Sequence, residues 1–97
     1  MLVPGDDPPF LTVCLTDATE EFPLRLRQGN ELIRRLEAAG GAPGLVPRIF
    51  AARAAAFPQR FTARPEDERA LLAALEAGPE VTGRLAELRE ALASRET

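Results

Sequence analysis

The sequence predicts an α+β fold in which a two-stranded antiparallel β-hairpin is followed by, and packs on, three to four α-helices. Apolar and polar residues alternate over residues 10–27, which is the period of a strand with one buried face. From residue 30 onward, apolar residues instead recur at helical spacing between glycine and proline breaks. The 97 residues suit one domain. We therefore expect a single domain over residues 1–97, with an irregular lead-in at 1–9, the hairpin at 10–27 and the helical part at 30–95.

The hairpin is predicted by two alternating runs, FLTVCLT and FPLRLR, which the polar segment DATEE separates. β-Branched residues in the first run favour a strand. The apolar side of the two runs, which we expect to face the core, consists of Leu11, Val13, Leu15, Phe22, Leu24 and Leu26. Arg25 and Arg27 fall on the opposite face. That face either stays in water or accepts an additional strand from a partner.

The first helix is predicted to begin at Asn30, whose side chain suits an N-cap, and to end at Gly40, which tolerates a left-handed conformation. Its apolar stripe consists of Leu32, Ile33 and Leu36. A second helix is predicted from Pro47 to Phe57, where Pro58 ends it.

The second helix is apolar almost all round. One arc of it holds Val46, Ile49, Phe50, Ala54 and Phe57, and alanines fill most of the remainder. Such a helix is normally buried, so one interpretation is a central core helix in which Ile49, Phe50 and Phe57 are buried and Arg53 snorkels or pairs with a carboxylate. The other interpretation is that one face meets another protein chain, with Arg53 and the phenylalanines as anchors.

Two further helices complete the pattern. Pro65 fits the first turn of the earlier one, Gly78 closes it, and its acidic N-terminal turn holds Glu66, Asp67 and Glu68. Its stripe consists of Leu71, Leu72 and Leu75. Pro79 opens the last helix, whose narrow stripe consists of Val81, Leu85, Leu88 and Leu92. This stripe predicts either an antiparallel pair with the preceding helix or a contact between two copies of the chain.

The run from Leu11 to Gly40, a hairpin ending in FPLRLR followed by ELIRRLEAAGG, resembles the start of small tail-assembly chaperones of phages and gene transfer agents. Those proteins place a short β-hairpin before a helix and then add further helices. The resemblance covers about a third of the chain and consists of this pattern, so it assigns no functional residue.

The residue types that most enzymes depend on are scarce. The chain has no His, Lys, Trp or Tyr and a single cysteine, Cys14. These absences exclude the usual zinc sites, the Ser-His-Asp triad, the Cys-His dyad and a lysine Schiff base. Cys14 lies in an apolar strand and is expected to be an inert core thiol. Asp6, Asp7 and Asp17 either hold a hard cation or, as such turn residues usually do, cap local backbone groups. We expect no enzyme, no cofactor and no metal.

Positive charge is concentrated in residues 48–64, which hold four arginines and no acidic residue: Arg48, Arg53, Arg60 and Arg64. Phenylalanines interleave with them, and guanidinium groups beside aromatic rings can bind phosphates and stack single-stranded bases. The alternative is that these arginines are neutralised within the chain by the acidic turn at residues 66–68.

Two hypotheses for function follow. The first is a small non-catalytic protein–protein interaction module, an adaptor, assembly factor or regulator of a larger complex, which binds another copy or another protein through Phe50, Arg53, Phe57, Arg25 and Arg27. The alternative is a nucleic-acid- or phosphate-binding regulator that uses the arginines of residues 48–64. The N-terminus has no signal-peptide pattern, and the longest mostly apolar run, residues 45–57, is too short to cross a bilayer. We expect a cytoplasmic protein without membrane contact.

Overall fold

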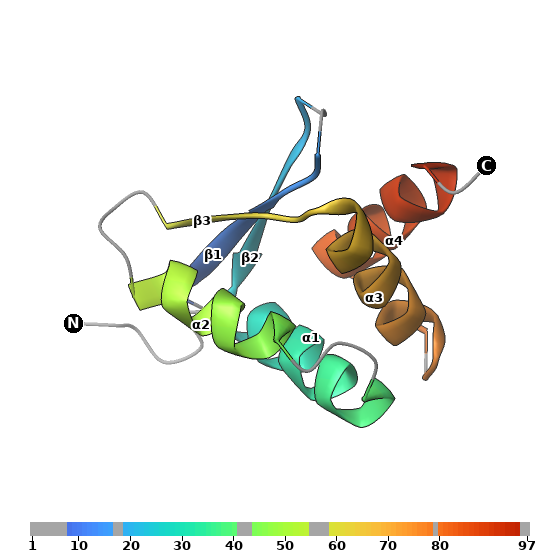
Figure 1. Ribbon diagram of the computed structural model, residues 1–97, viewed down its shortest axis with the longest axis horizontal. Helices are drawn as coiled ribbons and strands as arrows, with labels where there is room; N and C mark the ends of the chain where they lie inside the picture. The colour runs from blue at the N-terminus through green and yellow to red at the C-terminus, as the bar shows by residue number, and fades with distance from the viewer. Residues whose placement is uncertain (1–7, 17–18, 41–43, 55–58, 79, 96–97) are drawn as a thin grey trace.

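The computed structural model describes residues 8–16, 19–40, 44–54, 59–78 and 80–95. These residues form an α+β fold with three strands and four helices (Figure 1). In chain order the elements are β1 (Pro9–Cys14), β2 (Glu21–Arg25), α1 (Leu26–Ala39), α2 (Leu45–Ala54), β3 (Arg60–Thr62), α3 (Pro65–Glu76) and α4 (Gly83–Arg95). No helix in this part of the chain has the length and apolar character that crossing a membrane requires.

The sheet has the order β2-β1-β3. β1 pairs antiparallel with β2, with Val13 opposite Phe22, so the predicted hairpin pairing is confirmed. β1 also pairs in parallel with β3, with Val13 opposite Phe61, so the prediction of a two-stranded sheet is wrong. β3 has only three residues and is too short to show a period. It becomes a strand because the crossover through α1 and α2 returns it beside β1.

The start of β1 departs from simple alternation. The register shifts between Pro9 and Leu11, and both Phe10 and Leu11 are buried. The ring of Phe10 lies against Gly29 of α1, where an added Cβ would come within 2.4 Å of a ring carbon. Gly29 therefore allows α1 to approach the sheet closely.

The predicted boundary between hairpin and first helix is wrong. α1 begins at Leu26, and its N-cap is Arg25, not Asn30. Arg25 is the last residue of β2, whereas Arg27 lies on α1, so these two arginines do not share a strand face. Asn30 lies inside the helix instead of capping it, and the preceding Gly29 packs closely against Phe10. The predicted end at Gly40 is confirmed, with φ of 66°.

The helices cover the apolar face of the sheet. α1 and α4 pack against β2, and α2 packs against β1 and β3. Most predicted core residues are buried: Leu11, Val13, Leu15, Phe22, Leu24, Leu32, Ile33, Leu36, Ile49, Leu71, Leu75, Leu85, Leu88 and Leu92. Leu26 and Leu72 are only partly buried. The prediction missed Phe10, Leu45, Phe61, Ala63 and Ala74, which belong to the same core.

α2 is not the central core helix that one interpretation of the sequence predicted. It begins at Leu45, two residues before Pro47, and buries only Leu45 and Ile49. Phe50 is 46% exposed, so its assignment to the core is wrong. α2 packs against β1, β3 and α1 through one side only, and its other side is exposed. Phe57 and the predicted end of this helix lie outside the described residues.

α3 and α4 pack against each other, as predicted (Figure 1). α3 begins at Pro65 as predicted. α4 begins at Gly83, later than predicted from Pro79, which itself lies outside the described residues. All members of the last stripe are buried within the chain: Val81, Leu85, Leu88 and Leu92. This stripe is therefore filled by the fold.

Candidate functional site

The arginines of residues 48–64 occupy different surroundings. Arg48 binds Asp67, and Arg60 binds Glu21 on the sheet. Arg53 lies over the ring of Phe10, with its guanidinium carbon 4.7 Å from the ring centre. Arg64 is exposed immediately before α3, where its backbone N–H donates to the Asp67 carboxylate. The structure thus brings Arg48 and Arg64 together at Asp67, while Arg60 is engaged elsewhere.

The first turn of α3 holds two buried carboxylates, and Asp67 is the first. It is 4% exposed and accepts two hydrogen bonds of 2.8 Å from the guanidinium fork of Arg48. It also accepts the Arg64 backbone N–H at 2.9 Å, which satisfies an unpaired donor of the helix N-terminus. Arg48 in turn lies over Phe61. Burial alone would raise the pKa of Asp67, but the hydrogen bonds and charges of Arg48 and Arg64 lower it below its ordinary value.

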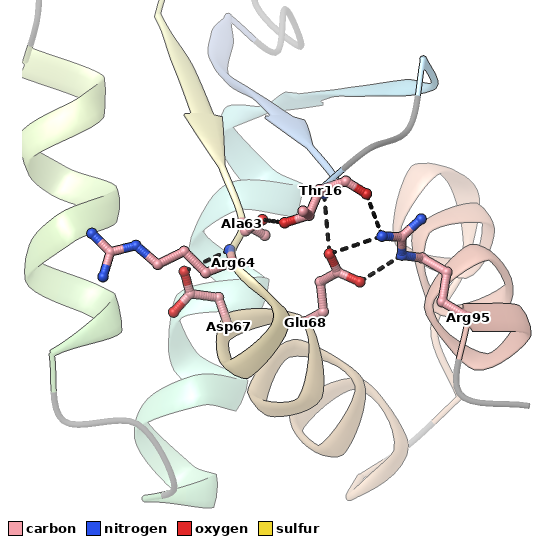
Figure 2. Close-up of polar contacts among 6 residues, drawn as sticks. All are labelled: Thr16, Ala63, Arg64, Asp67, Glu68 and Arg95. Atoms are coloured by element: carbon pink, nitrogen blue, oxygen red, sulfur yellow. Dashed lines mark hydrogen bonds and ion pairs between the residues drawn. The ribbon is translucent and has the colours of Figure 1, made fainter.

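Glu68 is the second buried carboxylate of this turn (Figure 2). It accepts the backbone N–H of Thr16 at 3.0 Å and the Nε–H of Arg95 at 2.5 Å. Arg95 also donates to the carbonyl of Thr16, and the Thr16 hydroxyl donates to the carbonyl of Ala63. Burial opposes ionisation of Glu68, yet the bonds from Arg95 and Thr16 lower its pKa.

We call Thr16, Arg48, Asp67, Glu68 and Arg95 the α3 cluster. It links the first turn of α3 to the end of β1, to α2 and to the last turn of α4. Both carboxylates are ionised at neutral pH and are held by arginines, so neither can donate a proton there and neither is a free base. The geometry is that of a buried structural network, and it bears out in part the prediction that the acidic turn neutralises nearby arginines.

No metal-binding group was found among the described residues, where no three His, Cys, Asp or Glu side chains gather. Asp6, Asp7 and Asp17 lie outside those residues. Cys14 is a free thiol on the open face of the sheet and is only half-buried, so its predicted place in the core is wrong. Its neighbours across the sheet are Glu21 of β2 and Thr62 of β3.

One surface joins two of the predicted partner-binding residues. A groove of about 590 Å³ between α1 and α2, the α1–α2 groove, is lined by Arg27, Asn30, Ile33, Arg34 and Phe50. Arg53 is exposed on the same helix as Phe50. Arg25 lies apart from this groove, on the sheet. Phe50 is the only large apolar side chain that is exposed among the residues described.

A second concave surface lies where the sheet meets the first turns of α1 and α4. We call it the sheet hollow; it has a volume of about 480 Å³ and is lined by strand residues, by Gln28 and Gln59, and by Arg25, Arg60 and Arg84. Reasoning from the sequence missed this group. Arg84 is 59 positions after Arg25 by the numbering of the chain, and only the packing of α4 near β2 brings them to one hollow.

Comparison with known protein families, with curated proteins and with solved structures finds no match to this chain. The resemblance of residues 11–40 to the start of tail-assembly chaperones therefore stays a prediction.

Proposed function

We propose that this protein is a small non-catalytic protein–protein interaction module, and that the α1–α2 groove binds a segment of a partner protein that combines acidic side chains with an apolar anchor. The observation that carries the proposal is the exposure of Phe50, at 46%, beside a groove with two arginines. Large aromatic side chains and arginines are the residue types most often responsible for binding energy at protein interfaces.

The positive charge of the groove favours a partner segment with negative charge. Arg27 and Arg34 line it, and none of the described residues that line it carries a carboxylate. Arg34 pairs with Glu31 at 2.8 Å, but its side chain is largely exposed, so this pair costs little to exchange for a carboxylate of a partner. An acidic segment would therefore be attracted to this surface, and a basic one repelled.

The neighbouring face of α2 can accommodate close contact. Ala51 and Ala54 are small and exposed beside Phe50, so a partner's backbone or helix can approach α2 closely. Arg53 is held over the ring of Phe10, which reduces the conformational freedom that binding would have to remove. Phe50 and Arg53 thus offer one apolar and one cationic anchor on a single helix.

Selection from a peptide library displayed on phage tests this proposal. We expect the selected peptides to be acidic and to contain an aromatic or aliphatic anchor. Phe50→Ala should weaken the binding of these peptides at least tenfold, because truncating an interface anchor costs roughly 2 kcal/mol. Arg69→Gln, which removes an exposed arginine of α3 outside the groove, is the matched control and should bind normally.

Two results would overturn the proposal. One is a set of selected peptides that binds the Phe50→Ala variant as tightly as the unaltered protein. The other is self-association through this face, which light scattering would detect as a dimer that Phe50→Ala converts to a monomer; the occupant would then be a second copy and not a foreign acidic segment.

A further inference from the structure

We propose that the sheet hollow is a binding site for a small phosphate-bearing compound, separate from the α1–α2 groove. The hollow has a volume of about 480 Å³, within the range of small-molecule sites. Its charged lining residues are Arg25, Arg60 and Arg84, and no carboxylate lines it among the residues described. Three like charges around one cavity repel each other and are stabilised by an anion placed between them.

Two helix N-termini add to the positive potential. Arg25 is the N-cap of α1 and Gln28 lies in its first turn, while Arg84 lies in the first turn of α4. Neither first turn contains an acidic residue, whereas the first turn of α3 contains three. The positive ends of the α1 and α4 dipoles therefore lie at the rim of the hollow without a carboxylate of their own.

The arginines of the hollow are available to a ligand. Among the described residues, the Arg25 side chain has no ion pair or hydrogen bond. Arg60 pairs with Glu21 at 2.5 Å and Arg84 with Glu87 at 3.2 Å, but the two arginine side chains are 52% and 50% exposed. Solvent-exposed pairs contribute little free energy, so a ligand can replace Glu21 and Glu87.

The chemistry favours a phosphate monoester. A phosphate group carries close to two negative charges at neutral pH and presents three oxygens, which match several guanidinium forks at once. A single carboxylate carries one charge and two oxygens. The volume exceeds what a phosphate ion fills, and the lining includes Pro9 and Pro23, which offer apolar surface to the organic part of the ligand.

Calorimetric titration of the full chain at low ionic strength tests the proposal. The probes are adenosine 5′-monophosphate, inorganic phosphate and adenosine, which separate an organic phosphate from free phosphate and from the base and sugar alone. We expect saturable binding of at least one phosphate probe and none of adenosine. If the monophosphate binds more tightly, the ligand is an organic phosphate; if the two phosphates bind equally, it is phosphate itself.

Variants locate the site. Arg25→Gln and Arg84→Gln should each weaken the binding of the phosphate probe about tenfold, because each removes a charge-assisted hydrogen bond. Arg69→Gln, an exposed arginine outside the hollow, should leave it unchanged. Glu21→Gln should instead tighten binding several-fold, because it releases Arg60 from its competing carboxylate. A merely structural role of Glu21 would not produce a gain.

Absence of saturable phosphate binding would overturn the proposal, as would binding that Arg25→Gln and Arg84→Gln leave intact. Affinity that appears only with single-stranded oligonucleotides and rises with their length would show a nucleic-acid surface in place of a small-molecule site. Phe50→Ala should not alter phosphate binding, so failure of this inference and failure of the proposed protein-binding function are distinguishable.

Discussion

The α3 cluster and the sheet hollow use arginine in opposite ways. At α3, Arg48 and Arg95 each meet a buried carboxylate, Asp67 or Glu68. In the hollow, Arg25, Arg60 and Arg84 surround a concave surface whose described lining has no carboxylate. The difference is set by where the acidic residues lie in the helices: α3 has three in its first turn, and α1 and α4 have none in theirs.

The role of an arginine in this protein depends on the carboxylates within its reach. A buried carboxylate is expensive to leave unpaired, so it holds its arginine in place and makes that arginine part of the fold. An exposed arginine without such a partner contributes little to the fold and remains available for binding. Substitutions in the α3 cluster should therefore reduce stability, whereas substitutions of the arginines in the sheet hollow should reduce binding.

The largest effect is expected at the α3 cluster. Arg48→Ala should lower the free energy of unfolding by about 3 kcal/mol, because it leaves the buried Asp67 carboxylate without the guanidinium that balances its charge. The value is at the lower end for buried pairs because the Arg48 side chain is 36% exposed. Urea unfolding followed by circular dichroism measures it. A loss below about 0.5 kcal/mol, the level of an ordinary surface change, would show that the network is dispensable.

A change in packing between α1 and the start of β1 should have a somewhat smaller effect on stability. Gly29→Ala places a methyl group 2.4 Å from the ring of Phe10, and overpacking of this kind costs about 1–3 kcal/mol. Gly44→Ala is the control, since an added Cβ there meets nothing within 4 Å. Thermal unfolding of the two variants compares them. Equal melting temperatures would contradict the close contact between α1 and the start of β1.

Acid should destabilise the protein through the α3 cluster. Burial raises the pKa values of Asp67 and Glu68, but their hydrogen bonds to arginine outweigh it and lower both. The unfolded chain therefore takes up protons at a higher pH than the folded chain. The contribution of the two groups is present at neutral pH and is lost as the pH falls through the ordinary carboxylate range and below. The free energy of unfolding should be measured across this range of pH. As the pH falls, it should decrease less steeply for the double variant Asp67→Asn with Glu68→Gln than for the unaltered protein.

The smallest effect on stability is expected in the hollow. The double change Arg25→Gln with Arg84→Gln should alter the free energy of unfolding by no more than about 0.5 kcal/mol, since both side chains are exposed and neither pairs with a buried carboxylate. Urea unfolding again measures the change. A loss comparable with that of Arg48→Ala would show that these arginines hold the fold together and would remove the contrast between the two regions.

The features that were predictable from the sequence are local ones. Pro65 with its acidic first turn predicted the start of α3, and Gly40 predicted the end of α1, because these signals act within one turn of helix. Alternation predicted β1 and β2 for the same reason. Packing between distant segments decided the remainder: β3 exists only beside β1, and α1 runs through Gly29 and Asn30 because Phe10 packs there.

The candidate sites could likewise be predicted only where the residues involved are close in the sequence. Pairing between the acidic turn and a nearby arginine was foreseeable for Asp67 and Arg48, but Glu68 is held by Arg95, which no local pattern connects to it. The hollow could not be predicted because Arg25, Arg60 and Arg84 come from three separate elements. The sequence left open whether Phe50 is buried or exposed, since the apolar pattern of its helix is the same whichever face the fold covers.

The most direct test of the contrast between the two regions is an NMR titration that follows the side-chain Nε–H signals of all arginines as adenosine 5′-monophosphate is added. We predict saturable shifts for Arg25, Arg60 and Arg84, with the signals of Arg48 and Arg95 unchanged. Shifts of Arg48 and Arg95, or uniform small shifts of every arginine, would contradict this prediction.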